Sequence, residues 1–335
     1  MTVGTSPGDA RDSGLSVEVA GPTEGEMAAG DAAELRSGFV AVVGRPNVGK
    51  STLVNAMLGT KVTITSPRPN TTRRTVRGVL HRPGVQAVFV DTPGLHRPRT
   101  ALGERLNDQI GEALEEVDVV VAVLDATMRL GPGDTRVLEA AAAALSGAAQ
   151  QAGVLPEERL RGLLVVVNKV DRARRDQVLE RLDEAHRLVE PQDAGVEYLP
   201  LSAATGEGVD TLVDTVLDRL PPGPPYFPED MVTDVPEAFW VAELVREQLL
   251  ARAREELPHS IACRVTEWEW PRIRVEILVE RDSQKGIVIG KGGLVLKEVG
   301  TAVRQQLPPG AFLELHVRVD KAWQQRPDEI ARLGY

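Results

Sequence analysis

Residues 44–51, GRPNVGKS, have the spacing of a phosphate-binding loop. The two glycines, Gly44 and Gly49, allow the backbone to fold around phosphate groups so that its amide N–H groups point inward. Lys50 would then reach the β- and γ-phosphates, and the Ser51 hydroxyl would bind Mg²⁺. An apolar run precedes the loop and a helical pattern follows it, so the sequence predicts a nucleotide-binding loop. The other loop residues expected to contact the nucleotide are Arg45, Pro46, Asn47 and Val48.

The DTPG motif, which begins at Asp91, follows an apolar run typical of a buried strand. Ligands of open α/β sheets bind at the carboxyl ends of the strands, so Asp91 should lie beside the phosphate loop. We expect the Asp91 carboxylate to hold Mg²⁺ through a water molecule and the Gly94 N–H to sense the γ-phosphate. The neighbouring positions predicted to line the nucleotide are Thr92, Pro93 and Leu95.

Two later motifs, NKVD and SAATG, have the chemistry needed to bind guanine. The Asp171 carboxylate can accept two hydrogen bonds, from guanine N1–H and N2–H₂, and adenine offers no such pair. Asn168 is expected to support the base and its loop, and Lys169 to pack its aliphatic stem on the purine. SAATG would close over the base and bring the Ala203 amide near guanine O6. The remaining members of the predicted base site are Val170, Ser202 and Ala204.

These motifs need a sheet whose strands end at one edge, and the apolar runs supply it. Near-continuous Val/Leu runs are typical of strands buried on both faces, so we predict an α/β domain with a doubly wound, mostly parallel sheet. A further strand near 75–80 should pair at one edge. The predicted buried strands cover 39–43, 85–90, 117–124, 163–168 and 196–201.

The segment PPGPPYFP at 221–228 predicts a domain boundary, because proline removes backbone donors and stiffens the chain. Beyond it, helical and alternating patterns predict an α+β domain with the order α-β-β-α-α-β. Residues 143–162 indicate a helix that continues into a surface insertion. The expected organisation is an acidic disordered tail over 1–37, a nucleotide-binding domain over 38–220, a linker over 221–230 and a second domain over 231–335.

The second domain contains KGIVIGKGG, at 285–293, which looks at first like another nucleotide loop. It is one residue short of that spacing and no Ser or Thr follows the lysine. The element order, with a G-x-x-G turn between two helices, instead resembles a type II KH domain. In that setting Lys291 would supply a charge to an RNA backbone, while apolar neighbours form a groove for unstacked bases. The predicted turn is Gly290, Lys291, Gly292 and Gly293, and the predicted groove residues are Ile287, Val288, Ile289 and Leu294.

The segments GRPNVGKSTLVNAMLG, NTTRR, DTPGLHRPRTALGERLN and ERDSQKGIVIGKGGLVLKEVG together resemble the Era family of GTPases. The resemblance spans nearly all of residues 38–335 and implies GTP hydrolysis to GDP and phosphate. It implies that Thr72 completes the Mg²⁺ site in the GTP state, with Thr71 beside it. Asn70 stands where the family pattern has glutamine. Lys50, Thr72, Asp91 and Gly94 are the residues expected to act in catalysis.

Leu95 follows the DTPG motif, where Ras-like enzymes place a glutamine that orients the attacking water. Leucine has no polar atom for this task, so we expect a slow switch. Even with glutamine, intrinsic hydrolysis in Ras is on the order of 10⁻⁴ s⁻¹. The resemblance implies that a backbone-held water and a monovalent cation take over this role, with Asn47 as the candidate K⁺ ligand.

Composition limits the partners of this 335-residue chain. Its net charge of −10 argues against binding nucleic acid through overall electrostatics, and no DNA partner is expected. A local patch over 281–304, with five basic and two acidic residues, surrounds the G-x-x-G turn. A single cysteine, Cys263, favours a reducing cytoplasm, and the five scattered histidines predict no zinc site. We expect a cytoplasmic monomer.

The resemblance further implies binding near the 3′ end of 16S ribosomal RNA, a role in 30S subunit assembly and rRNA processing, and peripheral contact with the inner face of the cell membrane. No amphipathic basic helix in the sequence explains the membrane contact. Two alternatives stay open at this point. One is an RNA-binding protein that uses the GTPase fold as a scaffold, although intact Lys50 and Asp171 argue against it. The other is a metabolic NTPase or kinase, against which the NKVD motif argues.

Overall fold

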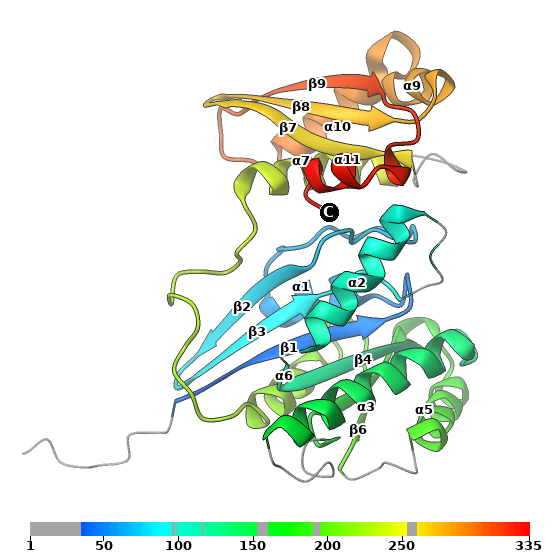
Figure 1. The fold of residues 1–335 in the computed structure, drawn as a ribbon, viewed down its shortest axis with the longest axis vertical. Helices are drawn as coiled ribbons and strands as arrows, with labels where there is room; N and C mark the ends of the chain where they lie inside the picture. The colour runs from blue at the N-terminus through cyan, green and yellow to red at the C-terminus, as the bar shows by residue number, and fades with distance from the viewer. Residues whose placement is uncertain are drawn as a thin grey trace, which may run out of the picture. The chain divides into compact units, whose positions relative to one another are not determined.

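The computed structural model describes residues 35–95, 98, 100–115, 117–152, 160–189, 195–252 and 260–335. Its first part is built on a six-stranded sheet with the order β2-β3-β1-β4-β5-β6 (Figure 1). The strand predicted near 75–80 is the edge strand β2, and it runs antiparallel to β3, whereas the other neighbouring strands described in this sheet are parallel. The strands are β1 (Arg36–Gly44), β2 (Val76–Arg82), β3 (Val85–Asp91), β4 (Val119–Asp125), β5 (Leu163–Asn168) and β6 (Glu197–Pro200).

Helices cover both faces of this sheet, which explains why its central strands are apolar throughout. One face packs against α1 and α6, and the other against α2, α3 and α5. Every residue of β4 and β5 is buried, so neither strand has a polar face to read as an alternating pattern. The helical elements are α1 (Lys50–Leu58), α2 (Ala101–Glu115), α3 (Pro132–Ala152), η1 (Val170–Arg172), α5 (Arg175–Val189) and α6 (Val209–Asp218).

The parallel strands bring the sequence motifs to one edge. The phosphate motif starts at Gly44, the last residue of β1, while Asp91 ends β3 and Asn168 ends β5. Register confirms the alignment, because Val42 of β1 pairs with Asp91 and Asp125 of β4 pairs with Asn168. A doubly wound sheet with the motifs at its carboxyl edge was predicted, and it is confirmed.

The second sheet has the order β7-β8-β9, with β8 and β9 parallel. Helices α7, α9 and α10 pack on one face of it around an apolar core. The predicted order α-β-β-α-α-β is confirmed. Its elements are α7 (Glu237–Arg252), β7 (Ala262–Glu269), β8 (Arg272–Val279), α9 (Asp282–Ile289), η3 (Lys291–Gly293), α10 (Leu294–Arg304) and β9 (Phe312–Val319).

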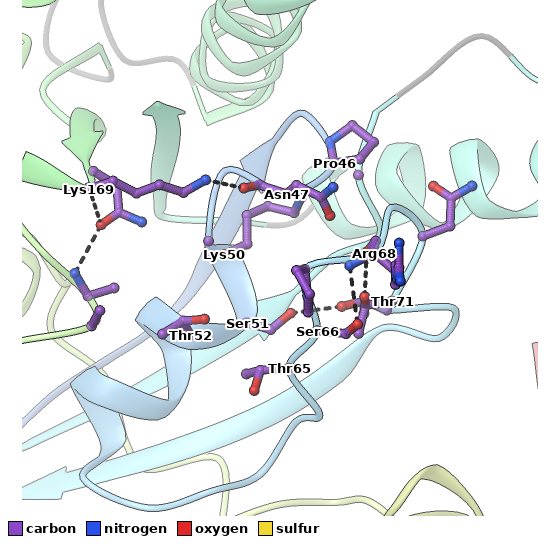
Figure 2. A pocket seen from close by; sticks show the side chains of 18 of the residues that line it. Pro46, Asn47, Lys50, Ser51, Thr52, Thr65, Ser66, Arg68, Thr71 and Lys169 are labelled. Atoms are coloured by element: carbon purple, nitrogen blue, oxygen red, sulfur yellow. Dashed lines mark hydrogen bonds between the residues drawn. The ribbon is translucent and has the colours of Figure 1, made fainter. Parts of the chain in front are cut away.

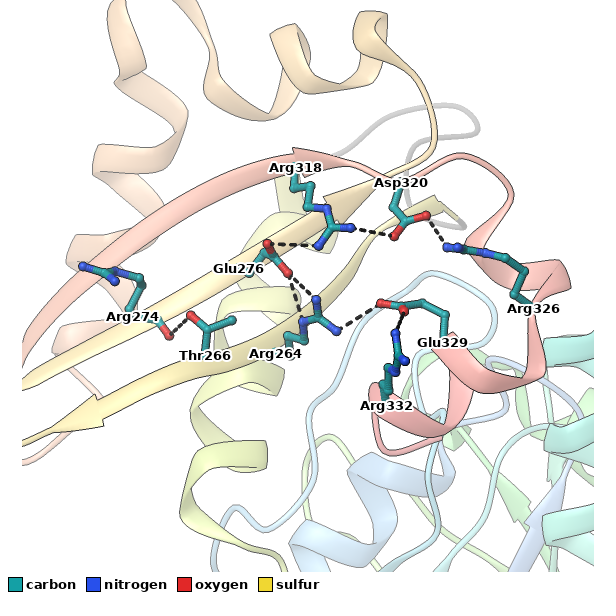
Figure 3. A network of polar contacts seen from close by, with 9 residues as sticks. All are labelled: Arg264, Thr266, Arg274, Glu276, Arg318, Asp320, Arg326, Glu329 and Arg332. Carbon is teal, nitrogen blue, oxygen red and sulfur yellow. Dashed lines mark hydrogen bonds and ion pairs between the residues drawn. The ribbon is translucent and has the colours of Figure 1, made fainter.

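A C-terminal segment that the sequence patterns did not reveal follows β9. It consists of η4 (Trp323–Gln325) and α11 (Pro327–Arg332), and its buried Trp323 and Tyr335 pack in one cluster with Leu102 and Leu106 of α2. Figure 3 shows how an ion pair fastens it to the second sheet: Arg264 of β7 binds Glu329 of α11 at 3.0 Å, and Glu276 of β8 holds the same Arg264 at 2.7 Å.

The structure bears on the predicted N-terminal tail, the insertion and the proline-rich linker in different ways. The tail predicted over 1–37 lies almost wholly outside the described residues, and β1 already begins at Arg36. Helix α3 runs to Ala152, inside the predicted insertion, while 153–159 also lie outside the described residues. The proline-rich linker is hydrogen-bonded to the first sheet, since Ser37 Oγ donates to Pro224 O at 2.6 Å.

Candidate nucleotide site and RNA-binding turn

A cavity of about 520 Å³ lies at the carboxyl edge of the first sheet (Figure 2). Its volume is within the range of small-molecule sites. All four predicted motifs contribute to its lining, together with the loop that follows α1. The lining residues are Pro46, Asn47, Gly49, Lys50, Ser51, Thr52, Thr65, Ser66, Pro67, Arg68, Asn70, Thr71, Thr72, Gly94, Asn168, Lys169, Asp171, Arg172, Ala203 and Ala204.

Lys50 lies inside the phosphate loop. Its ammonium donates to the carbonyl oxygens of Gly44 and Arg45, both at 3.0 Å. Burial lowers the pKa of Lys50 to about 8, and attraction to Asp91 opposes that shift. Burial destabilises the charged ammonium, and a nearby anion stabilises it again. The loop is therefore electrostatically suited to bind phosphate. Arg45 is fixed from outside the loop by Asp134 at 2.9 Å.

Ser51, Thr72 and Asp91 meet beneath this loop, as predicted for a Mg²⁺ site. The Ser51 and Thr72 hydroxyls are 2.8 Å apart, and Thr72 Oγ1 donates to Asp91 Oδ2 at 3.3 Å. Burial raises the pKa of Asp91, while Lys50 and the neighbouring hydroxyls lower it. Asp91 Oδ1 is buried and has no hydrogen-bond partner among the described residues. Hydroxyl and carboxylate oxygens are hard ligands, so these residues fit Mg²⁺.

Sequence reasoning missed Thr63, which also contacts the Asp91 carboxylate. Its hydroxyl donates to Asp91 Oδ2 at 2.9 Å. Thr63 lies in the loop after α1 and belongs to none of the motifs, so only the hydroxyl itself could have drawn attention to it.

The base end of the cavity is organised by Asn168. Its Nδ2 donates to Val48 O at 2.8 Å, and its Oδ1 accepts from the N–H groups of Lys169 and Ala203. One side chain therefore joins the phosphate loop to the NKVD and SAATG segments. Gly49 is required here, because it has φ 103° and a Cβ would lie 2.4 Å from Asn168 Nδ2.

The Lys169 ammonium links the NKVD segment to the phosphate loop and to the end of β4. It donates to Asn47 O at 2.5 Å and to Asp125 Oδ2 at 2.6 Å. Asp125, at the end of β4, is a second residue that sequence reasoning missed. Asp171 is oriented by Ser202, whose hydroxyl donates to Asp171 Oδ1 at 2.6 Å. Its carboxylate lines the cavity, as base recognition requires.

The Ala203 amide makes a contact that the sequence did not predict. The Ala203 N–H was expected to lie near guanine O6, but in the structure it donates to Asn168 Oδ1 at 2.9 Å. The reason is geometric, since Asn168 ends β5 next to the turn that carries Ala203. This amide therefore supports the loop, and Ala203 also lines the cavity, so its proximity to guanine O6 stays a prediction.

The segment around Gly94 closes on the phosphate loop. A Cβ at Gly94 would lie 2.6 Å from Pro46 N, so only glycine allows this approach. Leu95 donates its N–H to Gly44 O at 3.2 Å, and its side chain packs against the core of the first domain. An apolar, core-facing side chain cannot orient water, which agrees with the sequence interpretation of Leu95.

Two asparagines of the site, Asn47 and Asn70, have left-handed backbones, with φ of 67° and 57°. Asparagine tolerates this region better than most residues. The replacement of the family's glutamine by Asn70 therefore suits the loop conformation seen here. Asn47 is exposed and lines the cavity.

The predicted RNA-binding turn lies between α9 and α10. Gly290, Gly292 and Gly293 have φ of 73°, 61° and 78°, so the backbone needs glycine there. Helix α10 begins directly after the turn without a side-chain cap, which leaves N–H groups for an anion. Lys291 is exposed beside them.

The predicted base groove needs a correction at Val288. Ile287 and Leu294 are 59% and 57% exposed, but Val288 is 2% exposed and belongs to the core of the second domain. Ile289 is partly buried and packs against the same core. Successive residues of a helix point in different directions, so the run of apolar residues could not all face one groove. Ile287 and Leu294 form the accessible apolar surface.

Known protein families match both the nucleotide-binding part and the second domain of this chain. Residues 39–169 match the family described as 50S ribosome-binding GTPase, and residues 256–324 match the KH domain family. The fold and the two sites define a P-loop GTPase that carries a KH domain.

The chain belongs to the Era family of GTPases. "GTPase Era" of Mycobacterium sp. (strain KMS) is 47% identical over 314 residues, which cover 90% of this chain and 99% of that protein. "GTPase Era" of Mycobacterium avium (strain 104) is 46% identical with the same coverage. The crystal structure of Era with MgGDPNP and nucleotides 1506–1542 of 16S ribosomal RNA has a TM-score of 0.78 at 39% identity, covering 90% of this chain and 99% of that chain. A variant of Aquifex aeolicus Era bound to GDP·AlF₄⁻ has a TM-score of 0.79 at 38% identity, with the same coverage.

The chain is therefore a member of a GTPase family, and the two related Era structures contain MgGDPNP and GDP·AlF₄⁻. This result decides against the scaffold and the metabolic kinase alternatives. Among the described residues, the structure contains no helix with the length and apolarity needed to cross a bilayer.

Proposed function

We propose that this protein is a slowly hydrolysing GTP switch that binds 16S rRNA near its 3′ end and acts in 30S subunit assembly and rRNA processing. The observation that carries the proposal is a direct link between the two sites: the loop that holds Thr72 is hydrogen-bonded to the KH domain. Arg246 of α7 donates to Thr71 O, and Arg73 donates to Ile261 O at 2.7 Å. As part of this proposal we keep the domain limits predicted from the sequence, with the GTPase domain over 38–220, the linker over 221–230 and the KH domain over 231–335.

At the nucleotide, each residue has a definite role. Lys50 stabilises the β- and γ-phosphates, and the Gly94 N–H senses the γ-phosphate. Ser51 and Thr72 bind Mg²⁺ directly, and Asp91 binds it through water. When bound, Mg²⁺ neutralises charge that develops on the phosphates. Asp171 selects guanine through two charge-assisted hydrogen bonds, and Ser202 orients that carboxylate.

Leu95 leaves the attacking water without a side-chain partner, which supports slow hydrolysis. We assign the positioning of that water to backbone groups and to a K⁺ ion bound by Asn47. The left-handed backbone and exposed side chain of Asn47 support this assignment.

At the RNA, the turn Gly290–Gly293 meets backbone phosphates through α10 N–H groups and Lys291. Ile287 and Leu294 receive unstacked bases, with Ile289 behind them. The choice of 16S rRNA rests on the related Era complex with nucleotides 1506–1542 of that RNA. Action on the 30S subunit follows from the same RNA.

Coupling between the two sites runs through buried charges. Arg246 is fully buried and is held by Glu243 on its own helix while it reaches Thr71 O. Arg73 lies within 5.4 Å of the Trp323 ring and 5.6 Å of the Tyr335 ring. Loss of the γ-phosphate releases the loop around Thr72, and these contacts transmit the change to the KH domain.

We further propose that the protein is a cytoplasmic monomer that makes peripheral contact with the inner face of the cell membrane. Sedimentation with vesicles of bacterial lipid composition tests the last point, and recovery of all protein in the supernatant would exclude it.

The direct test compares the affinity of the protein for an oligonucleotide from the 3′ end of 16S rRNA with GDP and with a non-hydrolysable GTP analogue. The analogue should strengthen binding, and equal affinities would show that the domains are not coupled. Lys291→Glu should weaken RNA binding in both states without changing GTP affinity. An unchanged RNA affinity in that variant would refute the KH assignment.

A further inference from the structure

Thr63 contacts Asp91 of the nucleotide site without lining the nucleotide cavity. Its side chain is 3% exposed, and its hydroxyl donates to Asp91 Oδ2 at 2.9 Å. Thr63 is absent from the lining of the nucleotide cavity, so it acts on a ligand only through Asp91. A threonine hydroxyl that is fully buried and directed at a carboxylate sets the orientation of that carboxylate.

The backbone of Thr63 is held by one side chain of α1, that of Asn55. Asn55 Oδ1 accepts from the N–H groups of Val62 and Thr63, at 2.9 and 3.1 Å. Its Nδ2 donates to Thr63 O at 2.9 Å. Asn55 lies four residues after Ser51, so both project from the same side of α1. The Ser51 hydroxyl and the Thr63 hydroxyl are therefore positioned by a single helix.

These contacts distinguish the two oxygens of Asp91. Oδ2 accepts from Thr63 and from Thr72, whereas Oδ1 is buried without a hydrogen-bond partner among the described residues. A carboxylate can rotate about its Cβ–Cγ bond, and the terminal torsion of aspartate is broad. A fixed donor on one oxygen removes that freedom and leaves the other oxygen for the metal and its water.

We propose that Thr63, held in place by Asn55, is a positioning residue for the Mg²⁺ carboxylate Asp91. The proposal rests on the metal role assigned to Asp91 above. Residues that hydrogen-bond to a metal ligand tune its affinity, and their loss typically costs about 10–100-fold in metal binding. Because Asp91 binds the ion through water, the lower end of that range is expected here.

The simplest competing explanation is that the Thr63 hydroxyl only satisfies a buried carboxylate and stabilises the fold. Two substitutions separate the explanations. Thr63→Val keeps the branched shape and removes the donor, whereas Thr63→Ser keeps the hydroxyl and removes a methyl group. A purely structural role should affect thermal stability in EDTA, whereas a positioning role should change the response to Mg²⁺.

The experiment measures the release of a fluorescent GDP analogue from the full chain over a range of Mg²⁺ concentrations and in EDTA. Thr63→Val should need about 10-fold more Mg²⁺ for half-maximal slowing of release. Its rate in EDTA should match that of the parent, and Thr63→Ser should restore the parent response. Thr215→Val is a control for the loss of a threonine hydroxyl away from the site, since the Thr215 hydroxyl bonds within α6 to Thr211 O.

Asn55→Ala gives an independent test that leaves Thr63 unchanged, so the proposal stays testable if Thr63→Val is unstable. It should shift the Mg²⁺ response in the same direction. Asp91→Asn is the reference for the metal role itself. A shift in Asp91→Asn with none in Thr63→Val or Asn55→Ala would overturn the positioning role alone. No shift in Asp91→Asn would overturn the assigned metal role of Asp91 and, with it, the positioning role.

Discussion

Substitution of Glu247 would perturb the link between the nucleotide loop and the KH domain at a single contact. It lies on α7 and is 7% exposed. Its Oε1 accepts from Thr65 N at 2.9 Å, and its Oε2 binds the Lys61 ammonium at 2.6 Å. Glu247→Gln keeps the shape and the acceptor for Thr65 N, but it places an NH₂ group against the Lys61 ammonium. The substitution therefore weakens the interdomain contact without opening a cavity.

The expected magnitude follows from the exposure of the pair. A hydrogen bond to a charged group contributes about 1.5–3 kcal/mol when both partners are buried. The Lys61 side chain is 35% exposed, and solvent screening reduces that contribution. We therefore expect a loss of about 1 kcal/mol, which is roughly a 5-fold change in an equilibrium constant. The difference in RNA affinity between the GTP-analogue and GDP states should shrink by about this factor.

Fluorescence anisotropy with a labelled 16S rRNA 3′-end oligonucleotide measures both affinities. A double-mutant cycle with Lys61→Met assigns the effect to the pair, because the two changes should then be non-additive. Glu298→Gln is the control, since its ion pair with Arg252 joins α7 to α10 inside the KH domain. If Glu247→Gln leaves the ratio of affinities unchanged, the contact does not carry the coupling.

Three further outcomes are expected at the nucleotide site. Because burial lowers the pKa of Lys50 to about 8 and phosphate favours the ammonium, nucleotide binding should take up close to one proton near pH ~9 and far less near pH ~7. Calorimetry in buffers of different ionisation enthalpy measures this uptake, Lys50→Ala should abolish it along with most GTP affinity, and equal uptake at both pH values would contradict the assignment. Asp171→Asn should lower GTP affinity by about 100-fold or more, since two charge-assisted hydrogen bonds are lost, and xanthosine triphosphate should bind the variant better than GTP does. Asn47→Ala should remove the preference of GTP turnover for KCl over NaCl, and equal turnover of the parent protein in the two salts would exclude the K⁺ site.

The phosphate and base motifs could be predicted because their chemistry depends on short, fixed spacing. Lys50 and Ser51 follow Gly49 directly, and Asp91 and Asp171 each lie next to the end of an apolar strand. Parallel strands then bring these residues to one edge whatever the lengths of the connections. The doubly wound sheet followed from the same apolar runs.

Residues whose role depends on long-range packing could not be predicted. Thr63 reaches Asp91 only because Asn55 holds a loop between them, and no spacing rule encodes that contact. Asp125 depends on register between β4 and β5. The sequence shows three consecutive apolar residues from Ile287 to Ile289, but it does not show which of them faces solvent. The core role of Trp323 depends on the packing of the C-terminal segment against α2, which the sequence does not encode locally.

Crosslinking in cells shows whether this GTP-controlled protein holds 16S rRNA through its KH turn. RNA bound to the parent protein and to Lys291→Glu would be recovered and sequenced at matched expression. We expect the parent protein to recover the 3′ end of 16S rRNA and Lys291→Glu to lose this signal while still binding GTP. Recovery of the same RNAs from both proteins would exclude RNA binding through this turn.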